Sequence, residues 1–194
     1  MGQCSNKVKI GVISDTHGVV PAWHKAMGLF ANADLIIHSG DVLYHPPRIG
    51  FTPGYDIPAL VQLINSSPIP IVIARGNCDP EVYEELLEIP VQSPYAFLQF
   101  GDLRILVYHG HNPDPEYQRR LAGKYRPSIL ITGHTHIPVI ERIENTIHLN
   151  PGSPSHSKLE RGGVLIPTVG LIEGGNVRVI EIPTGQEVLS MPLR

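Results

Sequence analysis

The chain has 194 residues, 42% of them hydrophobic, which suits one domain with a substantial buried core. Its formal net charge of −3, without any block of lysine or arginine, gives no support for binding a nucleic-acid backbone or an acidic membrane surface. No apolar run approaches the ~18 residues that a membrane span needs.

The first residues lack the apolar centre of a signal peptide. The two cysteines, Cys4 and Cys78, are far apart, which argues against a disulfide scaffold and favours a reducing compartment. We therefore expect a single cytoplasmic domain over residues 1–194.

The first half of the chain alternates predicted strands with predicted helices. The strands are expected at residues 8–14, 34–41 and 69–74, and the helices at 21–31, 57–65 and 80–87. The segment between the second strand and the second helix, residues 42–56, is rich in proline, glycine and aromatic residues. It is unusually long for a loop in a compact domain.

The second half of the chain is mostly strand. A hairpin is expected over residues 95–109, followed by a helix at 116–125 and a strand at 128–134. Further strands are expected at 137–143, 146–150, 162–173 and 176–182. This order, βα units and then a β-meander, predicts an α/β protein with two stacked mixed sheets and helices outside them.

Polar side chains follow five of these strands, nearly all beside a glycine. They are Asp15 and His17, Asp41, Asn77, His109, and the pair His134 and His136. Ligands of α/β sheets bind beyond the carboxyl ends of the strands, where glycine allows a sharp turn. Two carboxylates, one amide and four imidazoles at one edge predict a site for two divalent metals. This donor set favours Mn, Fe, Zn, Co or Ni over calcium.

Each of these residues has a structural interpretation when taken alone. Asp15, Asp41 and Asn77 are common residue types in turns and caps, and a lone histidine is often a hydrogen-bonded core residue. Such explanations would have to recur at five strand ends, so we favour the joint metal site. His38 lies inside an apolar strand and is expected to be buried and hydrogen-bonded, whereas for His111 a substrate contact and a solvent-facing role both stay open. The other histidines, His24, His45, His148 and His156, have no second potential metal ligand at a supporting spacing in the sequence.

The motifs D-x-H, G-D, G-N, H-G and G-H-x-H, in this order between Asp15 and about Ser153, resemble the calcineurin-like metallophosphoesterase superfamily. The short chain, the sequence NCD at 77–79 and the loop HPPRIGFTPGYD at 45–56 resemble its small bacterial phosphodiesterases of the YfcE type. The resemblance implies a four-layer α/β/β/α sandwich. It also implies a dinuclear phosphodiesterase in which a metal-bridging hydroxide attacks a small phosphodiester substrate.

The resemblance also implies how the ligands are divided between two divalent ions. One would be bound by Asp15, His17, Asp41 and His136, and the other by Asp41, Asn77, His109 and His134. Asp41 would bridge the two ions and form the catalytic centre with Asn77. Mn²⁺ is the first expectation, with Zn²⁺, Fe²⁺, Ni²⁺ or Co²⁺ as alternatives.

Many family members carry a histidine where this chain has Cys78. A neutral thiol is a poor general acid at pH 7, so we expect phosphodiesters with good leaving groups to be preferred over alkyl monoesters. Cys78 itself is expected to be neither nucleophile nor ligand. Asp79, which precedes Pro80, is expected to be a helix N-cap. Arg48 and Arg75 are candidates for phosphate contacts, with surface roles as the alternative.

Two other functions stay open. One is a broad phosphomonoesterase, which a comparison of aryl monoesters and diesters would distinguish. The other is a non-catalytic metal-binding scaffold for protein contacts, as in a eukaryotic retromer subunit of similar fold, although the complete ligand set argues against it. The loop at 42–56 would shape either the pocket or the interface of a homo-oligomer.

Overall fold

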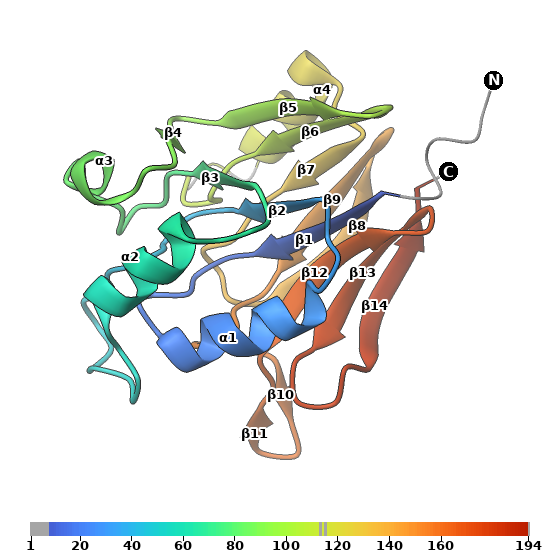
Figure 1. Cartoon of the computed structure of the whole chain (residues 1–194). Helices are drawn as coiled ribbons and strands as arrows, with labels where there is room; N and C mark the ends of the chain where they lie inside the picture. Colours follow the sequence, from blue (N-terminus) through green and yellow to red (C-terminus); the bar gives the residue numbers. More distant parts are fainter. Residues whose placement is uncertain (1–7, 113, 115, 194) are drawn as a thin grey trace.

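The structure is a computed structural model that describes residues 8–112, 114 and 116–193, so Cys4 lies outside it. Two mixed β-sheets pack against each other, with helices on the outside (Figure 1). Among the described residues, no helix is long and apolar enough to cross a membrane.

The first sheet contains seven strands. They are β1 (Lys9–Ile13), β2 (Leu35–His38), β3 (Ile71–Ala74), β4 (Val91–Gln92), β12 (Thr168–Glu173), β13 (Asn176–Glu181) and β14 (Glu187–Pro192). Their order is β14-β13-β12-β1-β2-β3-β4. Strands β1 to β4 run parallel, whereas β12 pairs antiparallel with β1 and extends the sheet through two further antiparallel strands.

The second sheet contains five strands. They are β5 (Ala96–Phe100), β6 (Leu103–Val107), β7 (Ile129–Ile131), β8 (Pro138–Ile143) and β9 (Thr146–Pro151). Their order is β5-β6-β7-β9-β8, with β6, β7 and β9 parallel. A separate two-stranded hairpin joins β10 (Glu160–Arg161) to β11 (Val164–Leu165). The prediction of one strand over 162–173 was therefore wrong, because Pro167 interrupts the run and cannot donate to a sheet.

In the described part of the chain, four helices connect these strands: α1 (Val20–Leu29), α2 (Ile57–Asn65), α3 (Tyr83–Leu86) and α4 (Tyr117–Tyr125). The backbone N–H of Ala59 donates to the side chain of Asp56 at 3.0 Å, so Asp56 caps α2. The helix expected at 80–87 is shorter than predicted, since α3 begins at Tyr83.

Three apolar clusters lie between successive layers. Helices α1 and α2 cover the first sheet through side chains such as Trp23 and Leu60, which pack with Ile13. Alternate residues of β1 point the other way, because side chains alternate across a strand. Ile10 therefore belongs to the cluster between the two sheets. The third cluster packs Leu121 of α4 on the second sheet. The expected α/β fold with two stacked mixed sheets is confirmed.

Candidate metal centre

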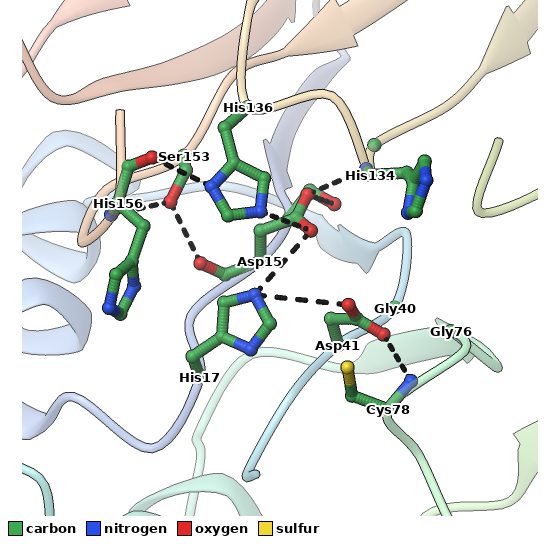
Figure 2. A network of polar contacts seen from close by, with 12 residues as sticks. Asp15, His17, Gly40, Asp41, Gly76, Cys78, His134, His136, Ser153 and His156 are labelled. Carbon is green, nitrogen blue, oxygen red and sulfur yellow. Dashed lines mark hydrogen bonds and ion pairs between the residues drawn. The ribbon is translucent and has the colours of Figure 1, made fainter. Parts of the chain in front are cut away.

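The seven predicted site residues all lie in loops that follow strands. Asp15 and His17 follow β1, Asp41 follows β2, Asn77 follows β3, His109 follows β6, and His134 and His136 follow β7. Because β1, β2 and β3 are parallel in one sheet and β6 and β7 are parallel in the other, the loops of each sheet emerge at one edge. Figure 2 shows the side chains of both sheets facing one another.

Three of the histidines are held in one tautomer by the backbone. In each, Nδ1 lies close to a carbonyl oxygen, which can only accept a hydrogen bond. The Nδ1–oxygen distances are 2.6 Å from His17 to Tyr44, 2.8 Å from His109 to Ser39 and 2.7 Å from His136 to His156. Nδ1 therefore donates to the backbone, which leaves Nε2 free to bind a metal ion or, in the metal-free protein, a proton.

These Nε2 atoms face the oxygens of two buried carboxylates. His136 Nε2 lies 3.2 Å from Asp15 Oδ1, and His109 Nε2 lies 3.3 Å from Asp41 Oδ2. His17 Nε2 lies between the two carboxylates, 3.7 Å from Asp15 Oδ1 and 3.8 Å from Asp41 Oδ2. Asp15 Oδ1 and the Nε2 atoms of His17 and His109 are buried without a hydrogen-bond partner. Converging lone pairs of this kind require a cation between them, so the residues present fit metal ions.

The charges of the site point the same way. Burial raises the pKa of Asp41, but the close contact with His109 and the positive charge of that ring lower it more, and the net pKa is below its usual value. Burial lowers the pKa of His109, yet the close contact with Asp41 and the charges of Asp15 and Asp41 raise it to about 9. The pair of carboxylates thus creates a negative potential that attracts positive charge into the space between the rings.

Each carboxylate uses its other oxygen to bind the protein. Asp15 Oδ2 accepts hydrogen bonds from Ser14 Oγ at 2.6 Å and from the backbone N–H of His134 at 2.9 Å. Asp41 Oδ1 accepts from the backbone N–H of Cys78 at 2.8 Å. These bonds orient both carboxylates, so that one oxygen of each points at the imidazoles.

The backbone of the site is strained. A positive φ is uncommon outside glycine, and it occurs at five site residues: Asp15 (54°), His17 (45°), Asp41 (56°), His134 (66°) and His136 (61°). Neighbouring glycines give the loops room. A Cβ on Gly76 would lie 2.1 Å from Asp41 Oδ1, and one on Gly133 would lie 1.9 Å from Ser14 Oγ. At these two positions only glycine leaves room for the neighbouring side chains.

Leaving aside Cys78, the side chains form two groups of potential ligands. One contains Asp15, His17 and His136, and the other contains Asp41, His109 and His134; within each, the ligand atoms lie within 4.8 Å of one another. Asn77 is exposed at the rim, where its Nδ2 lies 3.4 Å from Cys78 Sγ. It lines a pocket of about 640 Å³ together with residues of both groups.

Asp79 has a different role from the one predicted. Its carboxylate accepts from the backbone N–H groups of Gly76 at 2.7 Å and of Asp41 and Val42, both at 2.8 Å. The helix N-cap prediction is therefore wrong: α3 starts at Tyr83, and Asp79 instead ties the loop after β2 to the loop after β3. Burial raises its pKa to about 6, against the lowering effect of these N–H groups. The local sequence cannot identify partners 37 and 38 residues away.

Cys78 lies beside the site. Its Sγ is within 4.8 Å of the ligand atoms of His17 and Asp41. Burial and the negative charge of Asp41 raise the pKa of its thiol to about 12. The thiol is therefore protonated at neutral pH, as expected for a residue that is not a nucleophile.

The other polar residues singled out in the sequence behave differently from one another. His38 is buried and hydrogen-bonded, as predicted. His111 is exposed, with its ring 5.7 Å from that of His109. Arg75 pairs with Glu84 at 2.7 Å, whereas Arg48 lines the pocket of the site together with Lys158, which the sequence did not suggest.

The segment after β9 also supports the site, and sequence reasoning missed it. Ser153 Oγ and Ser155 Oγ donate to the backbone oxygen of Asp15 at 2.8 and 2.9 Å. The backbone oxygen of His156 accepts from His136 Nδ1, and the ring of His156 packs edge-on against that of His17 at 5.2 Å (Figure 2). The sequence does contain the pattern that identified the other site loops, because Gly152 and polar residues follow the strand that ends at Pro151.

Comparison with known proteins gives consistent results. The calcineurin-like phosphoesterase superfamily domain matches residues 8–170. Phosphodiesterase YfcE from Escherichia coli K12 is 35% identical over 153 residues, which are 78% of this chain and 82% of that protein. The structure of YfcE superimposes with a TM-score of 0.82 at 31% identity, covering 96% of this chain and all of that one. Vacuolar Protein Sorting 29 from Cryptosporidium parvum matches with a TM-score of 0.64 at 17% identity, over 96% of this chain and 99% of its own, which shows a shared fold alone.

Proposed function

The chain belongs to the calcineurin-like phosphoesterase superfamily and is a metal-dependent phosphoric ester hydrolase, and from this premise we propose that it is a phosphodiesterase with a dinuclear metal centre. The observation that carries the proposal is the convergence of unpaired Nε2 and carboxylate atoms in two neighbouring groups. The similarity to YfcE, a protein named a phosphodiesterase, supports diesters as the substrate class.

The two groups divide the ligands between two divalent ions. Asp15, His17, Asp41 and His136 would hold one ion, and Asp41, Asn77, His109 and His134 the other. Asp41 is the shared residue, because Oδ2 lies within 4 Å of both His17 and His109. Imidazole combined with carboxylate suits several transition metals, and Mn²⁺ is our first choice.

When bound, such ions lower the pKa of a water nucleophile and neutralise charge on the phosphoryl oxygens. The protein contributes orientation: the Nδ1–carbonyl bonds direct the rings, and Asp79 holds the Asp41 loop. Lys158 and Arg48 line the same pocket and are placed to attract an anionic phosphate. The protonated Cys78 thiol, with its pKa near 12, supplies no efficient general acid. Diesters with good leaving groups are therefore the favoured substrates.

Hydrolysis of bis(p-nitrophenyl) phosphate and p-nitrophenyl phosphate, each with Mn²⁺, Zn²⁺, Co²⁺ or Ni²⁺, tests the proposal. We expect the diester to be cleaved with the higher kcat/KM. Asp41→Asn should lower that value by at least ~100-fold, since removing a charged bridging ligand weakens both metal sites. The matched control is Asp102→Asn, in the exposed turn between β5 and β6. The proposal fails if no metal supports diester hydrolysis, or if the monoester is the better substrate with the same metal.

A further inference from the structure

A second pocket opens beside the metal centre. It has a volume of about 700 Å³, which lies in the range of small-molecule sites. Its lining residues are Tyr44, His45, Pro47, Phe51, Tyr55, Asn77 and Cys78. Pro47, Asn77 and Cys78 also line the pocket of the metal centre, so the two pockets are adjacent and share these three residues. A molecule whose phosphate lies at the metals can therefore place a substituent here.

The walls of this pocket are aromatic. The rings of His45 and Phe51 lie 4.4 Å apart, and Tyr55 packs against both at 5.5 and 5.1 Å. Phe51 nevertheless remains 72% exposed, which is unusual for a large apolar side chain inside a cluster. None of the lining residues is aspartate, glutamate, lysine or arginine. These features suit a flat, uncharged ring, which gains from stacking and needs no counter-charge.

The pocket is built on a loop that the metal centre holds in place. The segment 42–56, between β2 and α2 at the left of Figure 1, forms an isolated bridge from Tyr55 to Val19. Thr52 Oγ1 is hydrogen-bonded to His156 Nε2 at 2.8 Å, and the oxygen of Tyr44 accepts from His17. The aromatic wall is therefore fixed relative to the metal-binding side chains, and little ordering is needed when a substrate binds.

We propose that this pocket binds a flat, uncharged aromatic group of the substrate, either a simple aryl ring or a nucleobase, joined to the phosphate held at the metal centre. This inference rests on the proposed function and adds the substrate class. An interface with a second copy of the chain is the competing use of Phe51. The fact that Asn77 and Cys78 line both pockets favours the substrate, because a protein docked on Phe51 would also cover residues of the metal centre.

The test is binding of three monoanionic phosphonates to the Mn²⁺-loaded protein, measured by calorimetry. Methyl methylphosphonate has no ring, methyl phenylphosphonate carries an aryl ring, and thymidine 5′-methylphosphonate carries a nucleobase. All three are phosphonate monoesters with a single negative charge. We expect at least one of the ring-bearing compounds to bind about tenfold more tightly than the first, the effect of one stacked ring. The better of the two identifies the source of the ring.

The ratio of interest is the Kd of methyl methylphosphonate divided by that of the better ring-bearing compound. Phe51→Ala should bring this ratio close to 1. Phe97→Ala, which removes another exposed phenylalanine on β5, should leave it unchanged. The inference is overturned if the wild type binds all three phosphonates equally or if both variants lower the ratio alike. It is also overturned if Phe51→Ala changes the molecular mass in sedimentation but not the ratio, which would assign Phe51 to an interface between copies. Because binding is measured rather than turnover, loss of the ring preference is distinguishable from loss of phosphodiesterase activity.

Discussion

At the scale of single residues, His38 shows how a neutral side chain can position two loops of the candidate metal centre. Its Nδ1 accepts from the backbone N–H of Gly40 at 3.1 Å, so Nε2 must carry the ring proton. Nε2 then donates to Thr16 Oγ1 at 2.9 Å, and that hydroxyl donates to the oxygen of Val42 at 2.7 Å. Thr16 stands between Asp15 and His17, so the ring links the loop after β1 to the loop after β2.

If His38 were protonated, its Nδ1 would also carry a hydrogen. That hydrogen would point at the backbone N–H of Gly40, and Nδ1 could no longer accept from it. In line with this, burial lowers the pKa of His38 to about 3. The pKa of a histidine in the unfolded chain is about 6.5, so below that pH the unfolded chain binds a proton at His38 and the folded chain does not. The free energy of unfolding therefore falls as the pH drops below 6.5. We predict that the metal-free wild type loses about 2 kcal/mol more unfolding free energy than His38→Gln between pH 7 and pH 5.

Urea unfolding at the two pH values measures this difference. His24→Gln is the control, because His24 is exposed on α1 and should leave the wild-type loss unchanged. If the wild type and His38→Gln lose the same unfolding free energy between the two pH values, the pKa of His38 is not lowered by folding.

At the scale of elements, the short helix α3 supports the loop at 42–56. The hydroxyl of Tyr83, which is fully buried, accepts from the backbone N–H of Tyr44 at 2.7 Å and of Leu43 at 3.1 Å. Its ring also packs edge-on against Tyr44 at 5.5 Å. A helix of four residues has little stability of its own, so its contribution is to place this side chain.

Tyr83→Phe should lower the unfolding free energy by about 1–3 kcal/mol, because two amides lose their acceptor. Hydrogen exchange at Leu43 and Tyr44 should become faster, which distinguishes local loosening of the loop from a general loss of stability. Tyr125→Phe on α4 is the matched control. Unchanged exchange at both amides in Tyr83→Phe would remove α3 from this role.

At the scale of the whole molecule, the candidate metal centre joins the two sheets. Ser39 Oγ, after β2, donates to the oxygen of Thr132, after β7, at 3.0 Å. His109 Nδ1, after β6, donates to Ser39, and the N–H of His134 donates to Asp15. The proposed metal ions would therefore be bound by side chains from both halves of the sandwich, and the free energy of binding would stabilise the complete fold.

Added Mn²⁺ should consequently raise the Tm. At a free concentration 100 times Kd, the gain is about 2.7 kcal/mol, or roughly 5–10 °C for a chain of this size. A thermal melt with and without chelator measures the shift. Asp41→Asn should show a much smaller shift, and Asp102→Asn the full one. A wild-type Tm that does not respond to any of the four metals would contradict a metal site between the sheets.

Much of this molecule follows from its sequence. The alternation of apolar runs and turns was sufficient for the α/β class, for two mixed sheets and for helices such as α2, because periodicity and capping are local properties. The seven site residues could be selected because strand ends are visible as apolar runs that stop at glycine and polar residues.

The tertiary structure alone decided the contacts between loops far apart in sequence. Asp79 bonds to Asp41, Ser153 bonds to Asp15, and the aromatic loop lies beside Cys78. Such contacts depend on where the two sheets place their loops, and no local pattern encodes that distance.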